Sequence, residues 1–301
     1  MSTFGAQSTA DDVLRGIDLS GRLTLVTGGY SGIGLETTRA LTQAGAHVVV
    51  PARRPEVARA ALPGIEVDEL DLADLRSVRE FASRFLASDR EIDIVINSAG
   101  IMGCPETRVG PGWEAQFATN HLGHYTLVNH LWPAIAGGSG ARVVAVSSAA
   151  NPNSGIRWDD VQFERGYDKW LAYAQAKTAN VLFALHLDAL GREVGVRAFS
   201  VHPGAILTPL QRHLPRAEMV AAGWTDEQGN QIDPSFKTPA QGAATGVWAA
   251  TSPSLPGSDG PGGAYFEDCT LASRPDHDPD QAARLWTLSA QLTGVDLQVR
   301  P

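Results

Sequence analysis

The hydrophobic positions of the chain fall into two kinds of segment that follow one another in turn. The first kind is a short, nearly continuous run rich in Val, Ile and Ala, which predicts a strand covered on both faces. The second kind repeats its apolar residues at helical spacing, which predicts amphipathic helices. The strand-like runs are 23–27, 47–53, 92–100, 141–148 and 196–204, and the stretch 65–70 follows the second of them.

The helix-like segments lie between these runs. They are residues 33–46, 74–88, 113–135 and 170–183. In the second of them Asp74 is placed to cap the helix, and the apolar stripe consists of Leu75, Val78, Phe81 and Phe85. The alternation of strands and helices predicts an α/β fold, a doubly wound parallel sheet of the Rossmann type with helices on both faces.

Three segments fall outside this alternation. Residues 1–20 read as a polar N-terminal extension, after which 21–301 are expected to form one Rossmann-type catalytic domain. Between about 208 and 238 the periodicity fails, and a loop of this length in a compact domain is often a functional lid. The turn-rich stretch 251–263 is expected to be a surface loop that leads into a last strand at 263–268.

Composition and charge exclude several classes of protein. The chain has 301 residues, a formal net charge of −9 and no basic run, which argues against a nucleic-acid-binding surface. Two cysteines suggest neither a disulfide framework nor a zinc site. The chain shows no secretory signal pattern and no apolar stretch near the ~20 residues that span a bilayer, so a cytoplasmic protein is expected.

A glycine-rich loop follows the first predicted strand. The stretch TGGYSGIG places Gly28, Gly32 and Gly34 between that strand and a helix. Glycines there allow a close approach of a diphosphate to the backbone, and the helix N-terminus favours the anion. The alternative is a tight turn that binds nothing.

Two arginines follow the second strand, where an NAD site typically places an acid. Ala52 occupies the position of that acid, and Arg53 and Arg54 come next. A guanidinium can hold a 2′-phosphate bidentately, so NADP(H) is favoured over NAD(H). Alternatively, both arginines are solvated residues that open the next helix.

Tyr173 and Lys177 lie four residues apart and therefore on one face of a helix. Only three lysines are present, against twenty-one arginines, which gives a lysine at this spacing more weight. A nearby ammonium favours the phenolate and lowers the pKa of a tyrosine, so the pair suits acid–base catalysis on a carbonyl. In isolation the stretch is equally an ordinary core helix, with Leu171, Ala174, Val181, Leu182 and Leu185 as its buried stripe.

These motifs, in this order, resemble the short-chain dehydrogenase/reductase superfamily over nearly all of residues 20–270. The matching stretches are TGGYSGIG, DL (71–72), NSAG (97–100), VSS (146–148), YAQAK (173–177) and HPG (202–204). Ser98 departs from the second Asn of the family's NNAG motif. The stretch NHLGHYTLVNHL, the long gap between Ser148 and Tyr173, and the C-terminal segment resemble the retinol-dehydrogenase-like branch.

The resemblance implies roles for individual residues. It assigns catalysis to Asn120, Ser148, Tyr173 and Lys177, with Ser147 as the competitor of Ser148 and with Asn120 opening a helix kink that holds a water near Lys177. Tyr173 and Lys177 would also touch the cofactor. The other residues implied in cofactor binding are Gly28, Tyr30, Ser31, Gly32, Ile33, Gly34, Arg53, Arg54, Asp71, Leu72, Asn97, Ala99, Gly100, Pro203, Gly204, Ile206 and Thr208.

Together these features predict an NADP(H)-dependent carbonyl reductase or alcohol dehydrogenase. The family resemblance implies a hydrophobic small-molecule substrate, such as a bulky ketone, an aldehyde or a secondary alcohol. A regulatory protein that senses NADP(H) without turnover, and a reductase of C=C bonds, are the alternatives.

Some residues have two interpretations. Leu210, Leu214, Met219 and Trp224 form either an apolar substrate lid or a contact with a partner subunit. Family members mostly form dimers or tetramers through the helices at 113–135 and 170–183, whose apolar residues here could equally belong to the core of one chain. His121 and His124 are expected to be packing or surface residues, since no third metal ligand follows at a useful spacing. Trp113, Trp132, Trp248 and Trp286 are expected in the core or an interface.

Overall fold

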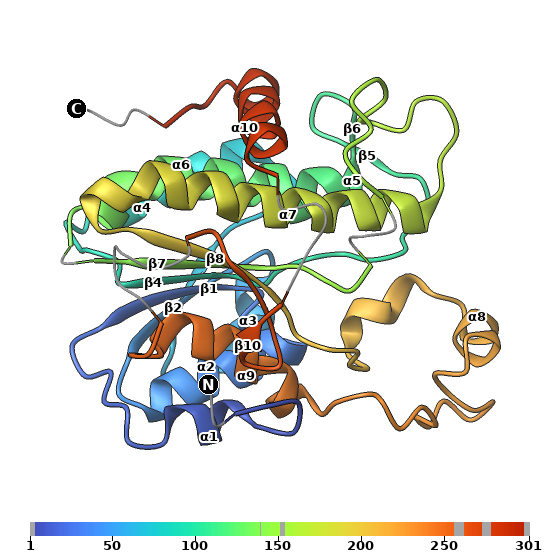
Figure 1. Ribbon diagram of the computed structural model, residues 1–301, viewed down its shortest axis with the longest axis horizontal. Coiled ribbons are helices and arrows are strands. Elements are labelled where there is room, and N and C mark those ends of the chain that lie inside the picture. The colour runs from blue at the N-terminus through green and yellow to red at the C-terminus, as the bar shows by residue number, and fades with distance from the viewer. Residues whose placement is uncertain (1–3, 139, 151–153, 256–261, 273–277, 298–301) are drawn as a thin grey trace.

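A mostly parallel sheet forms the centre of the protein (Figure 1). The computed structural model describes residues 4–138, 140–150, 154–255, 262–272 and 278–297. Within this part of the chain the sheet has eight strands in the order β10-β9-β8-β7-β4-β1-β2-β3, and only the β9–β10 pair is antiparallel. The strands are β1 (Leu23–Thr27), β2 (His47–Ala52), β3 (Glu66–Glu69), β4 (Ile94–Asn97), β7 (Arg142–Val146), β8 (Arg197–His202), β9 (Tyr265–Glu267) and β10 (Thr270–Leu271).

Helices cover both faces of this sheet, which confirms the predicted doubly wound α/β fold. One face carries α2 (Gly32–Gln43) and α9 (Pro239–Thr251), and α3 (Pro55–Ala61) connects β2 to β3. The other face carries α4 (Leu75–Leu86), α6 (Gly123–Ala136) and α7 (Lys169–Gly191). Outside α7 lies α10 (Pro279–Thr293), and the short helix η3 (Arg192–Val194) follows α7.

The strand order reverses between β1 and β4. The register pairs Thr27 with Asn97 and Asn97 with Ala145, so the segments after β1, β4 and β7 leave the sheet side by side. In a doubly wound sheet, ligands bind in the crevice at this reversal, outside the carboxyl ends of the strands.

The N-terminal extension is not a simple polar tail. Helix α1 (Ala10–Leu14) has Thr9 as its N-cap, and the Thr9 side chain forms a capping box with Asp12. Ala10, Val13 and Leu14 are buried, and the helix packs against α9 and α2. Five residues are too few to show helical periodicity, so only the packing reveals this element.

The predicted helix at 113–135 is wrong at its start and divided within. Trp113–Glu114 forms strand β6, which pairs with β5 (Arg108–Val109) in a separate antiparallel ribbon. The helical part consists of α5 (Ala115–Phe117), the π-helical turn η1 (Ala118–Leu122) and α6. The side chain of Glu114 accepts the backbone N–H groups of Gln116 and Phe117, which fixes the start of α5.

The irregular segment after β8 contains two short helices. They are η4 (Pro209–His213) and α8 (Arg216–Ala221), and α8 projects to one side of the molecule in Figure 1. The last predicted strand is β9, while the preceding turn-rich loop lies partly outside the described residues, at 256–261.

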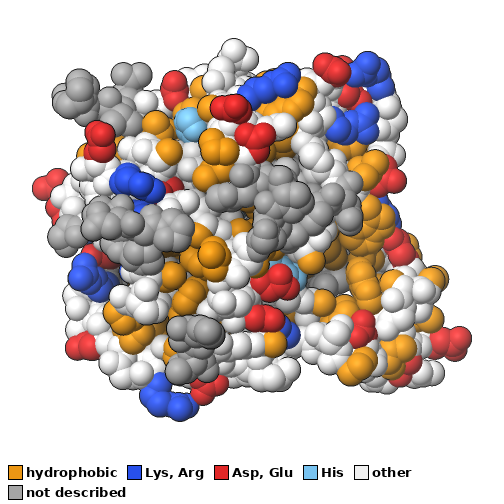
Figure 2. Space-filling model, viewed as in Figure 1, with side chains coloured by type: hydrophobic (Ala, Val, Ile, Leu, Met, Phe, Trp, Pro, Cys, Tyr) orange, Lys and Arg blue, Asp and Glu red, His pale blue; other side chains and the backbone are white. Residues whose placement is uncertain are grey.

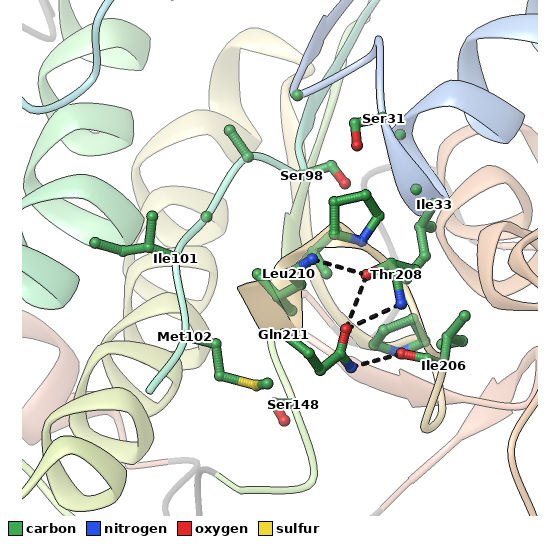
Figure 3. A pocket seen from close by; sticks show the side chains of 18 of the residues that line it. Ser31, Ile33, Ser98, Ile101, Met102, Ser148, Ile206, Thr208, Leu210 and Gln211 are labelled. Carbon is green, nitrogen blue, oxygen red and sulfur yellow. Dashed lines mark hydrogen bonds between the residues drawn. The ribbon is translucent and has the colours of Figure 1, made fainter. Parts of the chain in front are cut away.

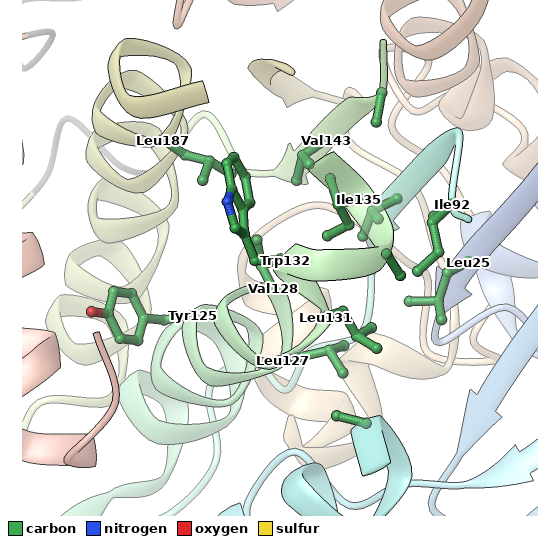
Figure 4. Packing of buried hydrophobic residues seen from close by; sticks show 14 of the residues in the cluster. Leu25, Ile92, Tyr125, Leu127, Val128, Leu131, Trp132, Ile135, Val143 and Leu187 are labelled. Carbon is green, nitrogen blue, oxygen red and sulfur yellow. The ribbon is translucent and has the colours of Figure 1, made fainter. Parts of the chain in front are cut away.

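The core on the α6 side is densely packed with aliphatic and aromatic side chains (Figure 4). Trp132 lies there with Leu187 of α7, and Trp113, Trp248 and Trp286 are also buried. The stripe predicted on α7 is confirmed at Ala174, Val181 and Leu182, which are buried. Leu185 is only partly buried, and the prediction is wrong at Leu171, which is 37% exposed. The chain therefore covers most of the apolar surface of α7 by itself.

Candidate active site

A cavity of about 580 Å³ lies at the carboxyl ends of β1, β4, β7 and β8 (Figure 3). It is the crevice expected at the reversal of strand order. Nearly every residue singled out from the sequence lines it: Gly28, Tyr30, Ser31, Gly32, Ile33, Gly34, Arg53, Arg54, Asp71, Leu72, Ala99, Gly100, Ser148, Tyr173, Lys177, Pro203, Gly204, Ile206 and Thr208. Asn97 and Asn120 do not line it, although both lie beside it.

The glycine loop allows a ligand to approach its backbone closely. Gly28 has φ +68°, and a Cβ there would lie 2.8 Å from the Cα of Ala99. A Cβ on Gly34 would collide with the carbonyl oxygen of Gly28. The loop therefore leaves its backbone open toward the cavity at the start of α2, the geometry that suits a diphosphate.

Three arginines converge on one side of the cavity. Arg53 and Arg54 line it beside Arg212, which the sequence analysis did not single out. Among the described residues, none of the three forms an ion pair with a carboxylate. Burial, followed by the charge of Arg53, lowers the pKa of Arg212. Uncompensated positive charge at this position suits an anionic ligand.

Ser148, Tyr173 and Lys177 meet at the base of the cavity. The Tyr173 hydroxyl is hydrogen-bonded to the side chain of Ser148. The Lys177 Nζ donates to the carbonyl oxygen of Val146 at 2.9 Å and lies 5.6 Å from the centre of the Tyr173 ring. Helix α7 supplies two of these groups, and the segment after β7 supplies the third.

The pKa of Tyr173 shifts in the direction opposite to the prediction. Burial raises it to about 12, although the hydrogen bond from Ser148 opposes this shift. Burial also lowers the pKa of Lys177 to about 8. The expected lowering of the tyrosine pKa is therefore not seen, because desolvation disfavours both charged forms and outweighs the effect of the ammonium.

The two adjacent serines have different partners. The Ser147 hydroxyl is buried and donates to the carbonyl oxygen of Lys177 at 2.8 Å. The Ser148 side chain accepts from the N–H of Ala150 at 3.2 Å and also contacts Tyr173. Ser148 is thus the serine placed beside the phenol.

Asn120 lies within the π-helical turn η1, at the position where the family resemblance implies a kink. Its side chain binds both backbone groups of Ile101, at 2.9 Å each. Its carbonyl oxygen accepts from Nδ1 of His124 at 3.0 Å, and Nε2 of His124 lies 2.8 Å from the Thr27 hydroxyl. Since Thr27 already accepts the N–H groups of residues 98 and 99, it donates to His124, which is held neutral.

Asn97 and Thr208 have surroundings that the sequence did not reveal. Asn97 is buried, and its side-chain amide has no hydrogen-bond partner within the described protein. Thr208 caps η4, since its hydroxyl accepts the N–H of Leu210 and Gln211 folds back onto its backbone (Figure 3). The same threonine packs against Gly32 of the glycine loop.

The outer end of the cavity is apolar. Met102, Trp170, Leu210, Trp224 and Phe236 line it. Leu214 and Met219 pack into the same cluster, so the four residues with two interpretations all lie beside this cavity within one chain. Figure 2 shows hydrophobic side chains gathered on this side of the molecule, between the lobe that carries α8 and the layer that contains α7. No sequence pattern indicated a site role for Trp170 or Phe236, because their position depends on contacts between distant segments.

Within the described ranges, no group of three or more His, Cys, Asp or Glu side chains is arranged to hold a metal ion. His121 and His124 are buried, and His121 lies 2.8 Å from the Ser289 hydroxyl of α10. None of the helices in the described part of the chain has the length and apolar character needed to cross a membrane.

Known proteins resemble this chain over almost its whole length. The family model described as short chain dehydrogenase matches residues 22–219. A probable oxidoreductase of Streptomyces antibioticus is 42% identical over 295 residues, which cover 90% of this chain and 97% of that protein. Retinol dehydrogenase 12 of Homo sapiens is 35% identical over 290 residues, covering 93% and 88%. The crystal structure of an uncharacterised protein from Mycobacterium paratuberculosis has a TM-score of 0.75 and 32% identity, covering 97% and 100%.

Proposed function

The chain belongs to the short-chain dehydrogenase/reductase family, in its retinol-dehydrogenase-like branch, and is an oxidoreductase. From this premise we propose that it is an NADP(H)-dependent carbonyl reductase or alcohol dehydrogenase that acts on a hydrophobic ketone, aldehyde or secondary alcohol. The observation that carries the proposal is the hydrogen-bonded pair of Ser148 and Tyr173 beside Lys177, at the base of a cavity that is apolar at its outer end.

The protein groups would handle the proton of the reaction. In reduction, Tyr173 Oη donates its proton to the developing alkoxide, and in oxidation the same oxygen accepts it. Ser148 donates a hydrogen bond to the substrate oxygen and stabilises the negative charge that develops on it. The Lys177 ammonium lies close enough to support the phenolate that reduction leaves behind. A bound nicotinamide supplies the hydride in reduction and accepts it in oxidation.

The residues of the cavity fit a dinucleotide. The glycine loop from Gly28 to Gly34 would hold the diphosphate, and the strand end at Pro203 and Gly204 would support the nicotinamide. Asp71 and Leu72 would meet the adenine. Tyr30, Ser31, Ile33, Ala99, Gly100, Ile206 and Thr208 complete the lining that would contact the cofactor.

Arg53 and Arg54 support the preference for NADP(H). Both lack a carboxylate partner among the described ion pairs and face the part of the cavity that follows β2, where the ribose of a dinucleotide binds. A guanidinium there would bind the 2′-phosphate of NADP(H) through charge-assisted hydrogen bonds.

The polar inventory of the outer cavity favours an uncharged substrate. Gln211 lines this region, but its amide oxygen accepts from the Thr208 N–H and its amide nitrogen donates to the Ile206 carbonyl. Its hydrogen-bonding groups therefore serve the loop. The remaining walls around Tyr173 are largely apolar, which suits a hydrophobic body with a single carbonyl.

Replacing Tyr173 tests the catalytic proposal. We expect Tyr173→Phe to lower kcat for the reduction of a panel of aryl ketones by at least about 10²-fold, because the proton donor is lost. The dissociation constant for NADPH, measured by fluorescence, should stay within a few-fold of wild type. Tyr125→Phe is the matched control, since Tyr125 is a core residue whose hydroxyl binds the carbonyl of Val295. Near wild-type turnover by Tyr173→Phe would refute the mechanism. NADPH binding by wild type without oxidation by any ketone would favour a sensor.

Replacing Arg53 tests the cofactor preference. We expect Arg53→Gln to raise KM for NADPH roughly tenfold or more and to leave KM for NADH nearly unchanged, because only NADPH carries the 2′-phosphate. Arg59→Gln is the control, since this arginine is exposed and contacts the carbonyl of Val67. A wild-type enzyme with higher kcat/KM for NADH than for NADPH would overturn the assignment.

A further inference from the structure

We propose that Trp170 is the wall that limits the size of the substrate, and that Glu218 is the residue that positions this wall. The inference rests on the proposed function, because it concerns the substrate end of the same cavity. It predicts that the enzyme prefers compact ketones and that releasing Trp170 extends its range to bulkier ones.

Glu218 joins two segments that are far apart in the sequence. Its carboxylate lies on α8, in the segment that follows β8. One oxygen accepts from the Lys169 Nζ at 2.5 Å, and the other accepts from the indole N–H of Trp170 at 3.0 Å. Both donors belong to the first turn of α7, so one carboxylate ties α8 to the start of the helix that carries Tyr173.

Trp170 is partly buried, and several contacts restrain its ring. Its ring meets Trp224 edge to face at 6.3 Å, and Trp224 in turn lies 5.9 Å from Phe236. The Lys169 Nζ lies 5.6 Å from the centre of the Trp170 ring. The indole also reaches Gly103, where a Cβ would lie at an ordinary contact distance of 3.5 Å from its Cη2 atom. An indole fixed in this way has little freedom to move aside for a larger ligand.

The position of Trp170 relative to Tyr173 turns this wall into a size limit. The two residues are three apart on α7 and therefore lie on the same side of the helix, and both line the cavity. A substrate carbonyl at the Tyr173 hydroxyl leaves its substituent to extend along α7 toward Trp170 and Trp224. The length of this apolar space is thus set by the indole that Glu218 holds.

The Glu218–Lys169 ion pair acts through its geometry and not through its contribution to the free energy of folding. Both side chains are about one-third exposed, and ion pairs of this kind contribute little to stability. Its consequence is geometric, because the two oxygens of Glu218 fix both the ammonium and the indole in one arrangement.

A series of aryl ketones that lengthen by one methylene at a time tests the proposal. For wild type with saturating NADPH, we expect kcat/KM to fall sharply beyond a certain length. In Glu218→Leu and in Trp170→Ala, the ratio of kcat/KM for the first refused ketone to that for the shortest ketone should rise roughly tenfold, the discrimination typical of one methylene in a pocket. Lys169→Met should have a smaller effect, since Glu218 keeps its bond to the indole.

The control is Glu227→Gln. Glu227 is an exposed carboxylate of the same loop, and no ion pair within the described structure involves it. It should leave the size profile unchanged. If Glu218→Leu and Trp170→Ala scale kcat/KM for all ketones by one factor, or if Glu227→Gln shifts the profile equally, the proposal is overturned.

A binding measurement separates this inference from the proposed function. Aryl ketones quench tryptophan fluorescence on contact, so their dissociation constants can be measured for the Tyr173→Phe protein without turnover. If wild type reduces no ketone, but Glu218→Leu binds longer ketones than the protein that keeps Glu218, the proposed function fails and the size limit set by Trp170 is supported. If the proteins with and without Glu218→Leu bind the ketones with the same dependence on length, the size limit set by Trp170 is refuted whatever the catalytic result.

Discussion

Tyr173 and Lys177 show how burial acts on single residues. Burial favours the neutral form of each side chain, with a pKa of about 12 for the phenol and about 8 for the ammonium. The phenol is therefore fully protonated at neutral pH and suited to donate a proton, whereas Lys177 changes its charge just above neutrality. The pH dependence of ketone reduction should therefore reflect the titration of Lys177 before that of Tyr173.

The pH profile of ketone reduction checks this reasoning. We expect kcat/KM for NADPH to be constant below pH 8 and to fall as the pH rises through about 8, because Lys177 loses its proton there. Tyr173 should contribute no inflection until far higher pH. In Lys177→Arg the side chain stays charged, so the fall near pH 8 should disappear even if the rate is lower. An unchanged inflection in Lys177→Arg would assign it to another group.

At the scale of elements, the π-helical turn η1 links the site to the sheet. Thr27 at the end of β1 binds the backbone of residues 98 and 99 after β4, and His124 connects that hydroxyl to the Asn120 carbonyl. A Cβ on Gly123 would collide with the Leu72 carbonyl, so the start of α6 lies directly on the segment after β3. One helix turn thus holds together the chain segments that border the cavity.

The packing of helix α1 predicts how a substitution in it changes the free energy of unfolding. Leu14 is 6% exposed and packs in the cluster formed with α2 and α9, which support the glycine loop and the segment around Ile206. We expect Leu14→Ala to lower the free energy of unfolding by about 2–4 kcal/mol, because a buried leucine is truncated. Urea denaturation measures this change. The control Leu271→Ala, at a position 61% exposed, should change it by less than about 0.5 kcal/mol, and an equal loss in both variants would contradict the packing of α1.

At the scale of the whole molecule, two buried histidines make folding sensitive to acid. Burial lowers the pKa of His121 to about 3 and that of His124 to about 4. Unfolded histidine titrates near 6.5, so below that pH the unfolded chain binds more protons than the folded one. Stability should consequently fall as the pH drops from about 6.5 toward 4.

Urea unfolding at pH 7, 6 and 5 tests this expectation. We expect the free energy of unfolding to fall by about 1–2 kcal/mol per pH unit between pH 6 and 5. His121→Gln should make this slope distinctly smaller, because one of the two fully buried histidines is gone. His47→Gln, at an exposed position, should keep most of the slope, and a slope that His121→Gln leaves intact would refute the assignment.

Features that depend on neighbouring residues can be predicted from the amino-acid sequence alone. Strand and helix periods predict the sheet and its layers, the glycines after β1 predict a loop open to an anion, and the spacing of Tyr173 and Lys177 places both on one helix face. These are local properties of the backbone, and the fold class follows from their order. The short helix α1 escaped this logic because it is held by packing against α9.

Contacts between distant groups become visible only in the folded protein. Glu218 and Trp170 are 48 residues apart, and Thr27 and His124 are 97 residues apart, so no periodicity relates them. The same holds for the pKa of Tyr173, since its direction is set by how completely the fold removes the phenol from water. Local pattern specifies the elements, whereas long-range packing specifies burial, hydrogen-bond partners and the walls of the cavity.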